Sequence, residues 1–300
     1  ANEAAPAIIS IFLGEQLEDI IEQIVRGDVS SSIQGEKLDT GVHVLPVLKK
    51  DATDRNRTSP FAFTGNKFEF RMLGSSMSIA GPNFTLNAMV ADVLQDFADE
   101  LEQAEDFDTA VDALIKKTVT EHQRIIFNGD GYSDEWVEEA EKRGLPNIKS
   151  MVEAIPYLAS EKSVKLFERQ NVMTKAELES RVEINYENYS KTINIEAKTM
   201  IDMAGKQFIP SIIKYTTSLA DSITKVQAAC PTADVSVQTE LLTKTSSLLA
   251  SAQKALTTLE AAVAEADTKE EGKEQALFFR KVVFADMETL RAPIDELEMI

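Results

Sequence analysis

The interpretation of this 300-residue chain depends on one stretch, Arg55-Asn56-Arg57-Thr58-Ser59-Pro60-Phe61-Ala62-Phe63-Thr64-Gly65-Asn66-Lys67-Phe68-Glu69-Phe70-Arg71. Two short runs, residues 61–63 and 67–72, flank Thr64-Gly65-Asn66, a sequence typical of a hairpin connection. The stretch therefore predicts two short antiparallel strands joined by a tight turn.

The second of these strands is expected to carry two different faces. Side chains alternate along a strand, so Phe68 and Phe70 should point one way and Lys67, Glu69 and Arg71 the other. In one interpretation the cations hold phosphate or carboxylate groups while the carboxylate ligates a divalent metal. In the other the charges form a solvated face with ordinary ion pairs. Spacing alone does not decide between them.

The rest of the chain predicts helices. Apolar residues at spacings of three and four indicate an amphipathic helix over residues 7–25, ended by Gly27. Further helices are predicted over residues 82–107, 108–127, a short segment after the N-cap Ser133, residues 174–229 with a break near Gly205 and Pro210, 235–266 and 269–290. We therefore expect an α+β fold, with short antiparallel strands followed by a large, mostly α-helical bundle.

Composition and charge exclude several classes of partner. Fifty acidic residues against 31 basic ones give a net charge of −19, which repels nucleic acid and anionic lipid. No apolar stretch approaches the roughly 18 residues of a membrane span. We therefore expect no nucleic-acid or membrane partners. The single cysteine, Cys230, cannot form an intramolecular disulfide, so we expect a cytoplasmic protein.

The stretch from Arg55 to Arg71 resembles the catalytic-domain segment of glutamine synthetases. In that family an Asn-Arg-Ser/Thr motif, here Asn56-Arg57-Thr58, precedes a strand with Glu-x-Arg, here Glu69-Phe70-Arg71, and a helix start with proline, here Gly81-Pro82-Asn83. The extended form from residue 54 to 71, and the segment Asn2-Glu3-Ala4-Ala5-Pro6, resemble the type III enzymes in particular. The resemblance implies that residues 1–105 are the C-terminal part of the catalytic domain and that residues 106–300 are the type III helical C-terminal domain.

Five site residues follow from this resemblance. Glu3 matches the glutamate that closes over the bound glutamate substrate and helps to take a proton from ammonium. Arg57 matches an arginine that contacts the phosphates of ATP, and Lys67 falls near the nucleotide. Glu69 matches a ligand of a divalent cation, Mg²⁺ or Mn²⁺, and Arg71 matches the arginine that holds the side-chain carboxylate of glutamate and the phosphoryl group on it.

The implied function is that of a glutamate–ammonia ligase of nitrogen metabolism, which forms glutamine through a γ-glutamyl phosphate and assembles as a ring-shaped homo-oligomer. The other metal ligands of the family lie upstream of this segment, and His43 and His122 match none of its motifs. We therefore expect the chain to be a piece of a longer protein, inactive by itself. A non-catalytic helical scaffold and a related ligase using another amine remain alternatives.

Two further residues complete the predictions. Ala62 stands where type I enzymes have a second phosphate-binding arginine, which suggests that another residue, such as Arg55, supplies that charge. Trp136, surrounded by Glu135, Glu138 and Glu139, is interpreted as the apolar anchor of an amphipathic helix rather than as a ligand-stacking side chain.

Overall fold

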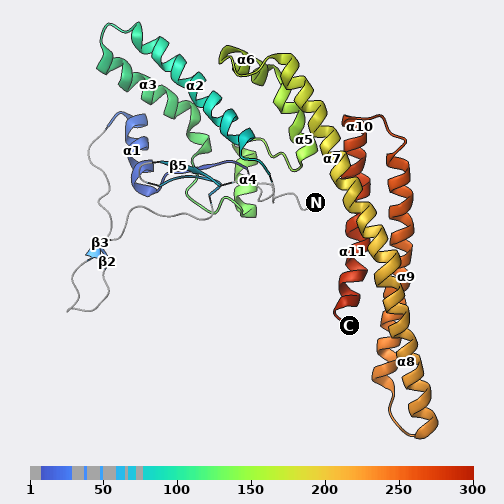
Figure 1. The fold of residues 1–300 in the computed structure, drawn as a ribbon. Helices are drawn as coiled ribbons and strands as arrows, with labels where there is room; N and C mark the ends of the chain where they lie inside the picture. Colours follow the sequence, from blue (N-terminus) through green and yellow to red (C-terminus); the bar gives the residue numbers. More distant parts are fainter. Residues whose placement is uncertain (1–7, 29–36, 39–47, 50–58, 65–66, 72–76) are drawn as a thin grey trace. The chain divides into compact units, whose positions relative to one another are not determined.

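The computed structural model describes residues 8–28, 37–38, 48–49, 59–64, 67–71 and 77–300 (Figure 1). The chain divides into two compact units. The mixed unit comprises residues 2–153 and 161–174, and the helical unit comprises residues 154–160 and 175–300. Strands occur in the mixed unit and long helices in the helical unit, so the fold is α+β as predicted.

The mixed unit contains short strands and helices of moderate length. Its elements are β1 (Ile11–Phe12), α1 (Glu15–Arg26), β2 (Lys37–Leu38), β3 (Leu48–Lys49), β4 (Phe61–Phe63), β5 (Phe68–Phe70), α2 (Ala80–Glu102), α3 (Phe107–His122), a 3₁₀ turn (Gln123–Ile125), α4 (Asp134–Lys142), α5 (Met151–Ala154) at the unit boundary, and α6 (Glu161–Arg169).

The predicted hairpin is confirmed. Strands β4 and β5 pair antiparallel with Phe61 opposite Phe70, Ala62 opposite Glu69 and Phe63 opposite Phe68. Strand β1 extends this sheet in the order β1-β4-β5 and runs parallel to β4, which the sequence did not predict. Strands β2 and β3 form a separate antiparallel pair.

The helix predicted over residues 7–25 is wrong in its first half. Residues 8–14 are not helical, β1 lies among them, and α1 begins only at Glu15. Ile8 and Phe12 are 5% and 4% exposed. Tertiary contacts that bury these residues in an extended segment therefore outweigh the local preference for a helix that the apolar spacing indicated. The predicted end is confirmed, because Gly27 has a φ of 81° and donates its N–H to the carbonyl of Gln23.

Helix α3 ends at His122, earlier than the predicted residue 127. The following residues return to the sheet, where Ile126 bridges Ile11 in parallel and the N–H of Phe127 donates to the carbonyl of Ile11 at 3.0 Å. The predicted N-cap of the next helix is confirmed, since the Ser133 hydroxyl accepts from the Trp136 backbone N–H at 3.2 Å.

The helical unit is built from long helices. Its elements are a 3₁₀ turn (Ile155–Ala159), α7 (Lys175–Met203), a π-helical turn (Ala204–Phe208), α8 (Ile209–Ala229), α9 (Ser236–Ala266), α10 (Lys273–Phe278), a second π-helical turn (Phe279–Val283) and α11 (Phe284–Glu298). The break predicted near Gly205 and Pro210 is the first π-helical turn. None of the described helices is long and apolar enough to cross a membrane.

The helical unit is held together by apolar packing along α9, which contacts α7, α8 and α11 (Figure 1). Ile193 of α7, Leu259 of α9 and Leu290 of α11 are at most 1% exposed. Several buried alanines on α9, among them Ala252 and Ala262, allow the neighbouring helices to approach closely.

The pair Ile193 and Ile195 tests this packing, because the two residues lie on the same helix and are 0% and 66% exposed. Replacement of Ile193 by alanine should lower the free energy of unfolding by about 2–5 kcal/mol through the cavity it creates. The matched Ile195→Ala change should stay within about 0.5 kcal/mol. Urea unfolding of the 300-residue chain followed by circular dichroism measures both, and equal losses would contradict the assigned core.

Candidate functional site

The β4–β5 hairpin places three charged side chains on one face of the sheet. Backbone hydrogen bonds close both ends of the hairpin, from the Thr64 N–H to the Lys67 carbonyl and from the Arg71 N–H to the Pro60 carbonyl, both at 2.8 Å. With β5 fixed in this register, alternation brings Lys67, Glu69 and Arg71 to the same side. We call these three residues the charged triad.

Within the charged triad, Glu69 interacts with both cations. The Arg71 guanidinium donates to Glu69 Oε2 from Nη2 at 2.9 Å and from Nε at 3.2 Å. The Lys67 ammonium lies 3.6 Å from the other oxygen, Oε1. The side chains of Arg71, Glu69 and Lys67 are 24%, 38% and 66% exposed, so the triad is solvent-accessible, with Arg71 the most buried.

The electrostatics of the triad favour an ionised carboxylate. The hydrogen bond from Arg71 lowers the pKa of Glu69, and the positive charges of Arg71 and Lys67 add to this effect. Two cations against one anion leave a local excess of positive charge in a chain of net charge −19. The arrangement can attract an anionic group while it offers a carboxylate oxygen to a metal ion.

The opposite face of the hairpin is aromatic, as predicted. The Phe61 and Phe68 rings stack at 5.5 Å between centroids, and Phe63 lies 5.1 Å from Phe68. Phe68 nevertheless remains 51% exposed. On the triad's side, Ala62 opposes Glu69 and is fully buried, so an arginine at this position would require the neighbouring chain to move.

The structure brings together three of the five predicted site residues. Glu3 and Arg57 lie outside the described residues, as do Arg55 and His43, and His122 is an exposed residue at the end of α3. Glu69 is chemically suited to a divalent cation, but the described part of the chain contains no group of three acidic, histidine or cysteine side chains that could hold one. These residues alone do not make a metal site.

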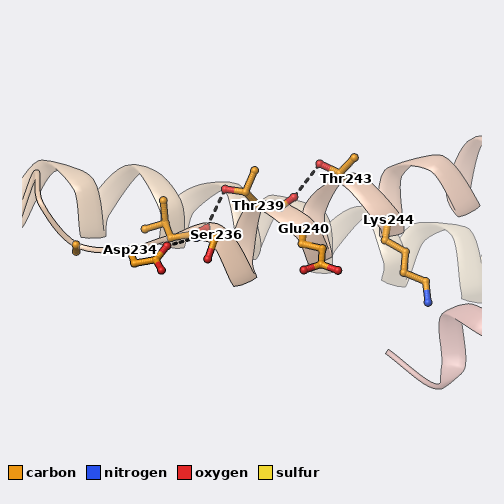
Figure 2. A pocket seen from close by; sticks show the side chains of 8 residues that line it. Asp234, Ser236, Thr239, Glu240, Thr243 and Lys244 are labelled. Carbon is orange, nitrogen blue, oxygen red and sulfur yellow. Dashed lines mark hydrogen bonds between the residues drawn. The ribbon is translucent and has the colours of Figure 1, made fainter.

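A hollow at the start of α9 is no alternative site (Figure 2). The eight residues that line it all lie between positions 233 and 244, and several of their polar groups bond locally. The hydroxyls of Thr239 and Thr243 donate to backbone carbonyls four residues earlier, and Lys244 pairs with Glu296 at 2.8 Å. Among these residues no acid and base converge on a common point.

The segment that precedes α1 is fixed by Asn128, which lies between α3 and α4. The side-chain oxygen of Asn128 accepts from the backbone N–H groups of Leu13 and Gly14 at 3.1 and 3.0 Å. Its amide donates to the carboxylate of Glu18. The partners are more than 100 residues apart, so no local sequence signal could have identified them.

Comparison with known proteins agrees with the motifs. The family model of the glutamine synthetase C-terminal domain matches residues 110–227. The whole chain is 38% identical to a type-3 glutamine synthetase of Dictyostelium discoideum, 38% to a glutamine synthetase of Butyrivibrio fibrisolvens and 34% to one of Bacteroides fragilis.

The chain spans 42–43% of the length of these relatives, while all of its own residues are covered. The resemblance inferred from the motifs is thereby confirmed. Over its whole length the chain is similar to part of a type-3 glutamine synthetase, in agreement with the motifs.

Proposed function

We propose that the complete protein is a glutamate–ammonia ligase that forms glutamine from glutamate, ammonia and ATP. The observation that carries this proposal is the charged triad on β5, in a chain that is homologous to glutamine synthetases throughout. In this proposal residues 1–105 are the C-terminal part of the catalytic domain and residues 106–300 are the helical C-terminal domain. The reaction takes place in the cytoplasm.

The first step activates the carboxylate. An oxygen of the glutamate side chain attacks the γ-phosphorus of ATP, the bond to the β-phosphate oxygen breaks, and γ-glutamyl phosphate and ADP result. The step brings two anions together, so positive charge must offset their repulsion. We assign Arg71 to the side-chain carboxylate and the phosphoryl group, Arg57 to the ATP phosphates, and Lys67 to the nucleotide.

The second step forms the amide. Ammonium must lose a proton before its nitrogen can attack the carbonyl carbon of γ-glutamyl phosphate, and phosphate then leaves. We assign this proton transfer to the Glu3 carboxylate, which also helps to keep water away from the acyl phosphate.

Glu69 is proposed as one ligand of a divalent cation, Mg²⁺ or Mn²⁺, which supplies charge neutralisation when bound. The remaining ligands lie outside the described residues. Arg71 bonds to Oε2 of Glu69 in the structure, and this bond holds both side chains in place. An isolated chain with one such carboxylate is proposed to be inactive.

The Arg71→Ala change in the complete protein should lower kcat/KM for glutamate by about 10²-fold or more, because the charge opposite the reacting carboxylate is lost. The matched control is Arg26→Ala, which removes an arginine that is 55% exposed and that, among the described residues, pairs with Glu22 and Asp28 at the surface. It should leave the rate within about twofold. ATP-dependent glutamine formation measures both variants, and an Arg71→Ala enzyme close to wild type would refute the assignment.

The Glu69→Gln change should raise the Mg²⁺ concentration needed for half-maximal activity by about tenfold or more, because an amide oxygen is a weaker ligand than a carboxylate. Glu100→Gln is the control, since Glu100 pairs with Lys117 on an exposed surface. A metal titration of glutamine formation compares the two. Equal Mg²⁺ requirements in wild type and Glu69→Gln would rule out Glu69 as a ligand.

The helical unit is proposed to serve assembly of a homo-oligomeric ring. Supporting this role, Ile184, Ile195 and Ile213 are between 49% and 66% exposed on α7 and α8, and apolar side chains of this size at a surface favour contact with another protein. The same observation favours the alternative of a non-catalytic scaffold.

Deletion of residues 175–300 from the complete protein should reduce its native mass to that of a smaller assembly, measured by light scattering. An unchanged number of subunits would show that the helical unit is not needed for assembly. The Arg71→Ala variant distinguishes the two proposals. If this chain is a non-catalytic scaffold, the change should leave glutamine formation by the complete protein intact, whereas the ligase proposal predicts its loss.

A further inference from the structure

The helical unit contains a hollow of about 400 Å³ beside α7, which we call the α7–α10 hollow. One wall is a single face of α7, and the other is formed by the residues that lead into α10 and the π-helical turn that follows it. Helices α7 and α10 contact each other along this region (Figure 1). The hollow therefore lies within the helical unit and shares no residue with the charged triad.

Two oxygen atoms of the residues that line the hollow are buried without a hydrogen-bond partner. Ser190 is 3% exposed, and its Oγ has no partner in the part of the chain that the structure describes. The same holds for Oδ1 of Asn194, one helical turn further along α7. Elsewhere in the unit, the hydroxyls of Thr199 and Ser211 donate to the carbonyl four residues earlier. Because buried polar atoms normally have partners, the two oxygens indicate a place for a donor from outside the chain.

The charge around the hollow is negative. It is lined by the carboxylates of Glu183, Glu187 and Glu271. Among the lining residues, Lys191 is the one cation, and it pairs with Glu187. The Glu183 carboxylate reaches the opposite wall, since a Cβ atom added to Gly272 would lie 3.2 Å from its Oε2. A ligand between the two walls would thus meet uncompensated negative charge.

These features select one class of ligand. The buried oxygens accept hydrogen bonds, and the carboxylates favour a positive charge, so a primary ammonium group satisfies both. A metal ion is disfavoured, because the described residues include no group of three acidic, histidine or cysteine side chains that could hold one. The volume suits a small molecule, and Ile184 and Phe279 supply apolar surface for a short alkyl chain.

We propose that the α7–α10 hollow is a binding site for a small aliphatic amine in its ammonium form. The ammonium group donates to Ser190 Oγ and Asn194 Oδ1, and the Glu183 carboxylate compensates its charge. The inference goes beyond the proposed function, because none of the residues assigned to glutamine formation lines this hollow.

Calorimetric titration of 1,4-diaminobutane into the complete protein, without ATP or glutamate, tests the site. Wild type should bind it saturably, at about one molecule per chain. Glu183→Gln and Ser190→Ala should each raise the dissociation constant about fivefold or more, because each removes a charge or an acceptor from the ammonium group. The matched control is Glu179→Gln, which removes a carboxylate of the same helix that pairs with Lys175 outside the hollow. It should change the constant by less than about twofold.

Thermal unfolding of Ser190→Ala distinguishes a lost contact from a lost structure. The Ser190 hydroxyl has no partner among the described residues, so its removal should not lower the unfolding midpoint in the absence of amine. Weaker binding with an unchanged midpoint supports the site. A lowered midpoint would overturn the assignment, because it would show that the hydroxyl is already bonded within the folded protein.

Three binding results would also overturn the inference. The first is no saturable binding. The second is equal weakening by Glu183→Gln and Glu179→Gln, which would show a general attraction to the negative chain. The third is displacement of the amine by an equal concentration of Mg²⁺, which would show a metal site. None of these results concerns glutamine formation, so failure of the inference is distinguishable from failure of the proposed function.

Discussion

The extended segment from Ile8 to Gly14 is the constraint on which the mixed unit depends. It is held by the Trp136 indole at Ile8, by backbone pairing with residues 126–127 at Ile11, and by the Asn128 side chain at Leu13 and Gly14. Each bond joins positions more than 100 residues apart. The extended conformation of this segment therefore depends on contacts between distant parts of the chain, and the burial of Ile8 and Phe12 stabilises it.

The position of the charged triad depends on this segment, because both belong to the same three-stranded sheet. Strand β1 pairs with β4, and β4 pairs with β5, so the face that carries Lys67, Glu69 and Arg71 is built outward from the anchored strand. Short strands of two or three residues have few hydrogen bonds of their own. The bonds from α4 and its preceding loop therefore stabilise the strand against which the hairpin pairs.

The sequence could predict the features that depend on residues close together in the chain, and it could not predict those that depend on distant contacts. The hairpin, its two faces and the Ser133 cap were predictable, because turn residues, alternation and capping act within about ten positions. The helix predicted over residues 7–25 was wrong over residues 8–14, because their apolar spacing is compatible with a helix and contacts with distant residues select the extended form. The triad's residues were predicted from alternation and resemblance, but its ion pairs were not, because alternation fixes the side of the strand and not the conformations of the side chains. The proposed roles of Glu3 and Arg57 rest on the resemblance.

The most direct test of the account is a product balance for the complete protein supplied with glutamate, ammonium, ATP and Mg²⁺. The account predicts glutamine, ADP and phosphate in equal amounts, with no glutamine when ATP is withheld. A folded protein that forms no glutamine, or that forms an ATP-dependent amide only when an alkylamine replaces ammonium, would contradict it.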